Sequence, residues 1–371
     1  MSCDYHLLPH PGIQSLSPYI PGKSAEDVAK EQGLTNIIKL ASNENPLGCS
    51  QLVAEALATL SGKQIATYPI SAGHPLLRNL AKTLAIDAEM ITLGNGSDAL
   101  IPLLQTCFAL HCDKHVLTHQ YAFISYGIHA KTLGIPVITT PLLPDWQVDI
   151  DAMIAACNEK TALIFLATPN NPTGLLVKQA EIERLLHNIP ETTLLVVDEA
   201  YYEYVNNAEK LNTISLLSLY PNLVITRTFS KAYGLAGLRL GYAITSTHIT
   251  SILRRVLPPF TVNGIALLAA NAALDDTEFI AHSVRSNMLG LKQLQQGLSQ
   301  LRLGYLPSAG NFITIDCNKD STSLYQTLQQ HGIIVRPLHP YDLKNYLRVT
   351  IGTEQQNSLF LNKLKELHHE K

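Results

Sequence analysis

Short apolar runs alternate with amphipathic stretches along most of the chain. Between residues 90 and 244 the apolar runs cover residues 90–93, 115–118, 137–139, 162–166, 194–197, 223–226 and 241–244. Runs that are apolar throughout, rather than at every second position, are typical of strands buried on both faces of a parallel sheet. Helical patterns lie between most of these runs, for example over residues 179–187. The alternation predicts an α/β fold with a large, mostly parallel seven-stranded sheet that is covered by helices.

The two ends of the chain have different patterns. Residues 1–45 are rich in proline and glycine and predict an extended arm and lid, with one short helix over residues 24–33. A helical run over residues 264–303 leads into strand candidates at 311–315, 333–335 and 346–350, which alternate with helices at 321–331 and 353–369. We therefore expect an arm (1–45), a large domain (46–260) and a smaller α+β domain (261–371).

Composition narrows the class of protein. The chain has 371 residues, of which 46% are hydrophobic and 15% are charged, and its net charge is −3. This charge gives no electrostatic reason to expect nucleic acid or an anionic membrane as a partner. No apolar run approaches the ~18 residues of a membrane span, and the N-terminus lacks a signal-peptide pattern. We expect a soluble, cytoplasmic protein whose six cysteines are reduced thiols.

Metal binding is not expected. The histidines at 111, 115 and 119 recur every four residues, a spacing that would suit a metal-binding helix face. Residues 115–118 are instead expected to form a strand, on which these side chains would be scattered.

The segment 228–242 has the composition of a phosphate-cofactor site. Thr228, Ser230 and Lys231 directly follow an apolar run, and Arg239 lies among the glycines at 234, 237 and 241. A lysine amine can form a Schiff base with a carbonyl-bearing cofactor, whereas hydroxyls and arginine hold phosphate oxygens. Glycines allow the backbone to approach closely. An ordinary surface loop with a solvated lysine fits this segment alone equally well.

Further loops with polar residues follow other strand candidates. Gly96, Ser97 and Asp98 precede a predicted helix, and a helix N-terminus favours phosphate. Two prolines fix the loop 168–174 and direct the amide of Asn171. Each loop by itself is also compatible with an ordinary turn. Because ligands bind at the carboxyl ends of parallel strands, we expect these loops to lie close together.

A carboxylate and a phenol follow the apolar run 194–197. Asp198 at the end of a buried strand requires a cationic partner, such as a pyridinium nitrogen. Tyr201 could donate a hydrogen bond to a phenolate oxygen. A helix-capping aspartate is the alternative interpretation.

In combination these motifs resemble a known family. PNNPTG with Asn171, DEAYYEY with Asp198 and Tyr201, and TFSKAYGLAGLRLGY with Lys231 and Arg239 have the order and approximate spacing of the fold-type I aminotransferases that use pyridoxal phosphate. With SNENPLG (42–48) and YLRVTIGT (346–353), the chain is most similar to the histidinol-phosphate aminotransferases of that family, over essentially its whole length. The resemblance implies transamination of L-histidinol phosphate with 2-oxoglutarate to imidazole acetol phosphate and L-glutamate, in histidine biosynthesis.

The resemblance also implies roles for individual residues. Lys231 would hold the cofactor and move the proton, Asp198 would keep the ring nitrogen protonated, and Tyr201 and Asn171 would hydrogen-bond the ring oxygen. Tyr121 would stack on the ring. The implied phosphate anchors are Gly96, Ser97, Asp98, Thr228, Ser230, Arg239 and, from a neighbouring subunit, Tyr68. The last of these implies a homodimer with shared active sites.

Arginines are the expected substrate-binding residues. Arg348 resembles the family arginine that binds the anionic end of either substrate, and Arg336 would assist with the phosphate. Tyr19 and Asn43 would contribute from the N-terminal lid.

Two departures leave the substrate open. Residues 338–346 lack the Gly-Tyr-Gly often found before the family arginine, and QYAFISY (120–126) resembles a branch in which aromatic amino acids are also suspected substrates. An aromatic-amino-acid aminotransferase and a threonine-phosphate decarboxylase are therefore alternatives. A ligand-sensing regulator would need a DNA-binding module, but the N-terminal residues are neither basic nor similar to a helix-turn-helix. A nicotinamide dehydrogenase would leave Lys231 unexplained.

Overall fold

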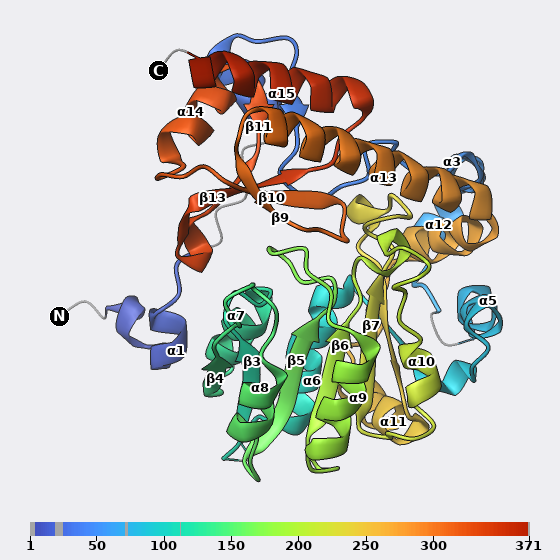
Figure 1. Cartoon of the computed structure of the whole chain (residues 1–371). Helices are drawn as coiled ribbons and strands as arrows, with labels where there is room; N and C mark the ends of the chain where they lie inside the picture. Colours follow the sequence, from blue (N-terminus) through green and yellow to red (C-terminus); the bar gives the residue numbers. More distant parts are fainter. Residues whose placement is uncertain (1–3, 19–24, 71–72, 112, 370–371) are drawn as a thin grey trace.

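The chain folds around two sheets. The structure is a computed structural model that describes residues 4–18, 25–70, 73–111 and 113–369. In Figure 1 the larger sheet and its helices lie below, and a smaller sheet lies above them, covered by the C-terminal helices. Near the N-terminus, helix α1 (Pro11–Gln14) lies beside α7 (Ser125–Thr132) of the larger part, and the two ends of the described chain lie toward the left of the view.

The larger sheet contains the predicted strands. Within the described residues it has seven strands in the order β2-β8-β7-β6-β5-β3-β4. Their bounds are β2 (Ile91–Gly94), β3 (His115–His119), β4 (Val137–Thr140), β5 (Thr161–Ala167), β6 (Leu194–Asp198), β7 (Leu223–Thr228) and β8 (Gly241–Thr245). Neighbouring strands are parallel except at β8, which is antiparallel to β7 and to β2. The prediction of a mostly parallel sheet is confirmed.

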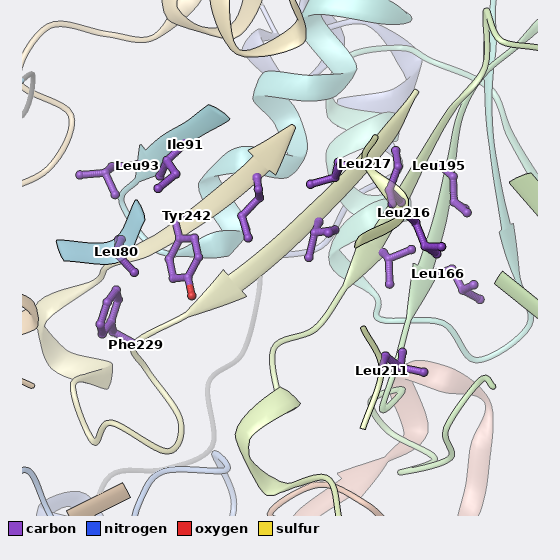
Figure 2. Close-up of a cluster of buried hydrophobic side chains, with 14 of the residues drawn as sticks. Leu80, Ile91, Leu93, Leu166, Leu195, Leu211, Leu216, Leu217, Phe229 and Tyr242 are labelled. Carbon is purple, nitrogen blue, oxygen red and sulfur yellow. The ribbon is translucent and has the colours of Figure 1, made fainter. Parts of the chain in front are cut away.

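Two apolar clusters explain why these strands are apolar throughout. Along β6, Leu195 and Val197 pack into one cluster and Val196 packs into the other, so that both faces of the sheet are buried. Figure 2 shows the first cluster, in which Leu195 lies near Leu166 and Tyr242 lies near Phe229. Full burial of each such side chain stabilises the fold by about 1.5–3 kcal/mol.

Helices cover both faces of the larger sheet. The first cluster is completed by helices α3 (Gln51–Ala58), α5 (Pro75–Leu84), α8 (Ile150–Ala156), α9 (Gln179–Asn188), α10 (Thr213–Leu216) and α12 (Gly264–Asp275). The second is completed by α6 (Leu100–Phe108), α7 (Ser125–Thr132) and α11 (Thr247–Val256). None of the helices in the described ranges is long and apolar enough to cross a membrane.

The smaller sheet is antiparallel. Its strands, in the order β12-β13-β10-β9, are β12 (Arg336–Leu338), β13 (Leu343–Thr350), β10 (Phe312–Asp316) and β9 (Gly304–Leu306). The helices of this part are α13 (Thr277–Gln300), α14 (Thr322–Gln330) and α15 (Glu354–His369). A two-stranded pair of β1 (Ile38–Lys39) with β11 (Ile333–Ile334) joins the N-terminal segment to this part of the molecule.

The remaining elements are short. They are helices α1 (Pro11–Gln14), α2 (Ala25–Gln32) and α4 (Gly62–Ile65) and the 3-10 helices η1 (Tyr5–Leu7), η2 (Ala88–Met90), η3 (Ser97–Ala99), η4 (Tyr202–Tyr204), η5 (Ala236–Leu238) and η6 (His339–Tyr341). The predicted arm therefore contains more helix than expected.

The predicted helix over residues 264–303 is in fact two helices. Asp276 separates α12 from α13, and its side chain accepts a hydrogen bond of 2.9 Å from the backbone N–H of Phe279. Asp at an N-cap satisfies a free backbone N–H and starts a new helix. The apolar residues of α12 pack with the larger sheet, whereas those of α13 pack mainly with the smaller one. The domain limits at 45/46 and 260/261 stay a prediction.

Candidate active site

A cavity lies at the carboxyl ends of β5, β6 and β7. It is lined by Ser97, Asp98, Phe123, Ala167, Pro169, Asn171, Asp198, Ala200, Tyr201, Thr228, Ser230, Lys231 and Arg239. The structure thus brings together most of the predicted cofactor-binding residues, although they come from four separate loops. Their common position follows from the sheet, because parallel strands end at the same edge.

Lys231 is half-buried at the wall of the cavity. Its Nζ lies 3.4 Å from the carbonyl oxygen of Ser42 and 5.7 Å from the centre of the Tyr201 ring. Burial, together with the nearby charge of Arg348, lowers the pKa of the Lys231 amine to about 8. Near neutral pH a larger fraction of this amine is uncharged, and so nucleophilic, than of an ordinary lysine amine.

The loop that carries Lys231 requires glycine at one position. Gly234 has a φ of +71°, and a Cβ atom there would lie 1.9 Å from the carbonyl oxygen of Gly48. Before it, the Ser230 backbone N–H donates 3.0 Å to Thr228 Oγ1, and Phe229 is fully buried in the core. These contacts fix the turn that places Lys231 in the cavity.

Asp198 ends β6 as a buried carboxylate. The hydroxyl of Tyr126 donates a hydrogen bond of 2.8 Å to Oδ2. Among the described residues, no group donates a hydrogen bond to Oδ1, which is also buried. Burial raises the pKa of the Asp198 carboxyl, and the hydrogen bond from Tyr126 only partly offsets this effect. A buried carboxylate that lines a cavity and has one oxygen without a hydrogen bond is suited to a cationic partner.

One end of the cavity is an anion cradle. Gly96 has a φ of +82°, and a Cβ atom there would lie 2.5 Å from a guanidinium nitrogen of Arg239. A Cβ atom at Gly241 would lie 2.2 Å from the backbone nitrogen of Ser97. Arg239 also donates to Ser230 Oγ at 3.4 Å. The two glycines thus let an arginine, a hydroxyl and a helical N-terminus converge, a donor set that suits phosphate.

Asp98 is held at this end by a residue that was not predicted. His129 Nε2 lies 3.2 Å from Asp98 Oδ2. Burial alone would raise the pKa of the Asp98 carboxyl, but the hydrogen bond from His129 is among the interactions that lower it overall.

Arg348 of β13 and Asn43 of the N-terminal segment contact residues of the cavity wall. Arg348 donates a hydrogen bond of 2.6 Å to Asn171 Oδ1 and another of 2.7 Å to the carbonyl oxygen of Ala41. Asn43, predicted to bind substrate from the lid, is buried and donates 2.9 Å to the Tyr201 hydroxyl.

Three further predicted site residues, among those that the structure describes, do not line the cavity. Arg336 is half-buried on β12, where its register partner is Arg348, and it does not line the cavity. Tyr68 is 74% exposed and stacks on Phe260, with ring centres 4.4 Å apart. Tyr19 lies outside the described residues.

Tyr121, expected to stack on the cofactor ring, is the third. Its φ is +56°, and its ring lies 5.4 Å from that of Trp146 instead. Phe123, two residues later, lines the cavity in its place. A left-handed backbone at Tyr121 turns the chain between the two residues, which sequence spacing did not indicate.

The sequence patterns did not indicate Phe123, Tyr126 or His129 as site residues. Phe123 and Tyr126 lie inside QYAFISY, the segment singled out for Tyr121. The partners of Tyr126 and His129 lie 72 and 31 residues away in the chain. Local patterns hold no signal for such pairs. No group of three or more His, Cys, Asp or Glu that could hold a metal ion occurs in the part of the chain that the structure describes.

Comparison with known proteins decides the family. The family model described as aminotransferase class I and II matches residues 35–364. The chain belongs to this family. Its predicted architecture is confirmed by solved aminotransferases such as the histidinol-phosphate aminotransferase from Sinorhizobium meliloti, in complex with pyridoxal 5′-phosphate. That structure has a TM-score of 0.88 at 28% identity, and the match covers 97% of each chain.

Curated members of the aminotransferase family are similar over the full length. Histidinol-phosphate aminotransferase 2 of Legionella pneumophila (strain Lens) is 55% identical, and the match covers 99% of this chain and 100% of that protein. Histidinol-phosphate aminotransferase 2 of Pseudomonas aeruginosa is 42% identical, again over 99% and 100%. The resemblance drawn from the motifs is therefore confirmed at the level of the family.

Proposed function

We propose that this aminotransferase uses pyridoxal 5′-phosphate to transfer the amino group of L-histidinol phosphate to 2-oxoglutarate, which gives imidazole acetol phosphate and L-glutamate in histidine biosynthesis. The main structural support for this proposal is that Lys231 and Asp198 line one cavity together with the anion cradle. Full-length identity of 55% to a protein named for this activity supports the choice of substrate.

The residues present fit the cofactor. Asp198 Oδ1 is buried without a donor from the described chain, which suits a protonated ring nitrogen. The phosphate would be held at the cradle by Gly96, Ser97, Asp98, Thr228, Ser230 and Arg239. When bound, pyridoxal phosphate supplies an electron-withdrawing ring that stabilises negative charge developing on the substrate carbon.

Protein side chains then supply orientation and proton transfer. Asp198 keeps the ring nitrogen protonated, and Tyr201 and Asn171 donate hydrogen bonds to the ring oxygen. Lys231 Nζ moves the proton to and from the substrate carbon, because its pKa of about 8 lets it act both as base and as acid. Phe123 lines the cavity where the ring of Tyr121 was expected.

Arg348 is the proposed anion-binding residue. Its guanidinium is buried and hydrogen-bonded to Asn171 and Ala41, so that it is already oriented beside the cavity. A planar guanidinium can accept either phosphate or carboxylate, which would allow one site to serve both substrates in turn. Arg336 and the lid residues Tyr19 and Asn43 remain proposed contributors to substrate binding.

The active enzyme is proposed to be a homodimer. Ile65, Tyr68, Ile70 and Phe260 are large apolar side chains that are between 52% and 74% exposed. Tyr68 and Phe260 share a surface hollow with residues of α4 and α12. A second copy would cover this surface and bring its Tyr68 to the phosphate end of the neighbouring site. In sedimentation experiments we expect the wild-type protein to be a dimer. The Phe260→Glu variant should dissociate into monomers and bind the cofactor more weakly. A wild-type monomer that retains full activity would contradict the shared site.

The test of substrate uses single amino donors. Histidinol phosphate, phenylalanine or tyrosine is added to the purified, cofactor-loaded enzyme without an amino acceptor, and the visible spectrum of the cofactor is followed. We expect histidinol phosphate to convert the cofactor to its aminated form far more efficiently than the aromatic amino acids. The aromatic branch is favoured by QYAFISY and by Phe123 in the cavity wall, and a faster reaction with phenylalanine would move the biological role to that branch.

A further inference from the structure

Asn43 has every side-chain and backbone polar atom hydrogen-bonded inside the protein. Its backbone N–H donates 2.9 Å to Thr350 Oγ1, and its carbonyl oxygen accepts 3.0 Å from Asn311 Nδ2. Its Oδ1 accepts 3.1 Å from Thr350 Oγ1, and its Nδ2 donates 2.9 Å to the hydroxyl of Tyr201. The side chains of Asn43, Asn311, Thr350 and Tyr201 are all buried, so water does not compete for these bonds.

The backbone of Asn43 is also constrained. Its φ of +53° lies in the left-handed region, which asparagine tolerates better than most residues. Thr350 lies at the end of β13, and its Oγ1 accepts the hydrogen bond from the backbone N–H of Asn43. The backbone N–H of Thr350 donates a hydrogen bond of 2.8 Å to the carbonyl oxygen of Leu40. The last residue of a small-domain strand thus holds the N-terminal segment at the point where it passes Tyr201.

The hydroxyl of Thr350 determines which way the Asn43 amide faces. The hydroxyl accepts the Asn43 N–H and therefore directs its single proton to Oδ1. With Oδ1 occupied in this way, Nδ2 faces Tyr201, whose oxygen then acts as the acceptor. Because Tyr201 accepts from Asn43, its own proton remains available for an acceptor on the cavity side.

We propose that Thr350 is a positioning residue: acting through the Asn43 amide, it fixes Tyr201 as a hydrogen-bond donor to the ring oxygen of the cofactor. This inference rests on the proposed function, and it deepens it. Without the Thr350 hydroxyl the amide is free to turn over and present Oδ1 to Tyr201. The tyrosine would then donate its proton to Asn43, and the ring oxygen would lose a donor.

The test compares Thr350→Val, which removes the hydroxyl and keeps the branched shape, with Thr350→Ser, which keeps the hydroxyl. Two properties of the loaded protein are measured: the dissociation constant of pyridoxal phosphate, and the pH midpoint of the visible spectrum of the bound cofactor. A donor at the ring oxygen favours the more alkaline spectral form, so its loss raises the midpoint. We expect Thr350→Val to raise the pH midpoint and to weaken cofactor binding about fivefold, which corresponds to the loss of one net hydrogen bond. Thr350→Ser should behave as wild type in both measurements.

A double variant separates positioning from simple destabilisation. In a Tyr201→Phe background, which lacks the donor, Thr350→Val is expected to produce no further shift of the midpoint. An undiminished shift in that background, a Thr350→Val spectrum identical to wild type, or a Thr350→Ser variant as impaired as Thr350→Val would each overturn the inference.

If Thr350→Val does not fold, Asn43→Asp carries the same test. Aspartate also tolerates the positive φ of this position, and it replaces the Nδ2 donor by an acceptor oxygen to which Tyr201 must donate its proton. It should raise the midpoint as predicted for Thr350→Val, and an unchanged midpoint would overturn the inference. A wild-type protein that binds no pyridoxal phosphate at Lys231 would overturn the proposed function and this inference together. Normal wild-type binding with an unaffected Thr350→Val variant would overturn this inference alone.

Discussion

Arg348 donates a hydrogen bond of 2.6 Å to Oδ1 of Asn171, a residue 177 positions earlier in the chain. The bond crosses from β13 of the smaller sheet to the loop that follows β5 of the larger sheet. Because Oδ1 accepts this bond, Nδ2 of Asn171 is left as the donor of the amide. The bond also orients the Arg348 guanidinium, whose positive charge helps to lower the pKa of the Lys231 amine. One contact therefore links the proposed anion-binding residue to the proposed cofactor-binding residues.

Arg348→Lys should weaken the binding of both substrates. Lysine keeps the positive charge but cannot make the bidentate, planar contact to a carboxylate or phosphate. We expect KM for histidinol phosphate and for 2-oxoglutarate to rise about 10- to 100-fold, the range for one charge-assisted hydrogen bond. Steady-state kinetics with each substrate varied in turn measure this effect. Arg285→Lys, at an exposed position of α13, is the matched control and should leave both values unchanged. A change in KM for neither substrate would remove the anion-binding role.

Capture of the cofactor should depend on pH through Lys231. The lowered pKa of its amine, about 8, means that the uncharged, nucleophilic form increases as pH rises through 8. After cofactor-free protein is mixed with pyridoxal phosphate, the rate of the visible spectral change should therefore rise between pH 7 and 9 and then level off. Lys231→Ala should bind cofactor without this change and should lose turnover. A rate independent of pH over that range, or turnover by Lys231→Ala, would contradict the assignment of the amine.

Asp198→Asn should decrease the reaction rate and stabilise the empty protein. The amide cannot hold the ring nitrogen in its protonated form, so the rate should decrease by at least about 10-fold, the lower end for loss of a charge-assisted hydrogen bond. The carboxyl of Asp198 has a raised pKa, which means that its charged form is unfavourable in the folded, cofactor-free protein. Thermal unfolding of cofactor-free protein should show a higher Tm for the variant at neutral pH. The difference should shrink as pH falls, because Asp198 becomes protonated. A wild-type rate, or a variant that is less stable at neutral pH, would argue against this description.

Glu203, on η4 directly after the site residue Tyr201, should make stability depend on pH. Burial raises the pKa of its carboxyl to about 7, although the charges of Arg227 and Lys210 oppose the shift and that of Glu199 adds to it. The folded state thus binds this proton more tightly than the unfolded chain, whose value is 4.5. The stabilisation is fully present below pH 4.5 and is lost as pH rises through about 7.

Glu203→Gln should therefore be more stable than wild type above pH 7, by on the order of 2–3 kcal/mol, and the gap should close toward pH 5. Denaturant unfolding at several pH values measures this difference. Glu209→Gln, at an exposed position nearby, should follow the wild-type curve. A Glu203→Gln variant that is less stable than wild type at pH 8 would show that the buried carboxylate is favourable in its charged form.

The course of the larger sheet was predictable from the sequence because all its strands except the edge strand β4 are buried along their whole length. Apolar residues at consecutive positions, as in residues 194–197 and 223–226, occur in few other local structures, and each predicted run became a strand within one or two residues of its expected ends. Elements that bury little were missed: β9 is exposed or half-buried along its length and left no apolar pattern. The break at Asp276 also escaped prediction, because both flanking segments are helical.

By itself, the sequence determined which loops form the site. Lys231, Asp198 and Asn171 each follow an apolar run, and the carboxyl ends of parallel strands share one edge, so their proximity was predictable before any side chain was placed. Only the tertiary structure decided how these residues are oriented. Phe123 replaces Tyr121 in the cavity wall because of one left-handed residue, Tyr126 reaches Asp198 across 72 positions, and Thr350 sets the Asn43 amide across 307. Local patterns record burial and turns, whereas the direction of a hydrogen bond depends on which distant side chain meets it after the chain has folded.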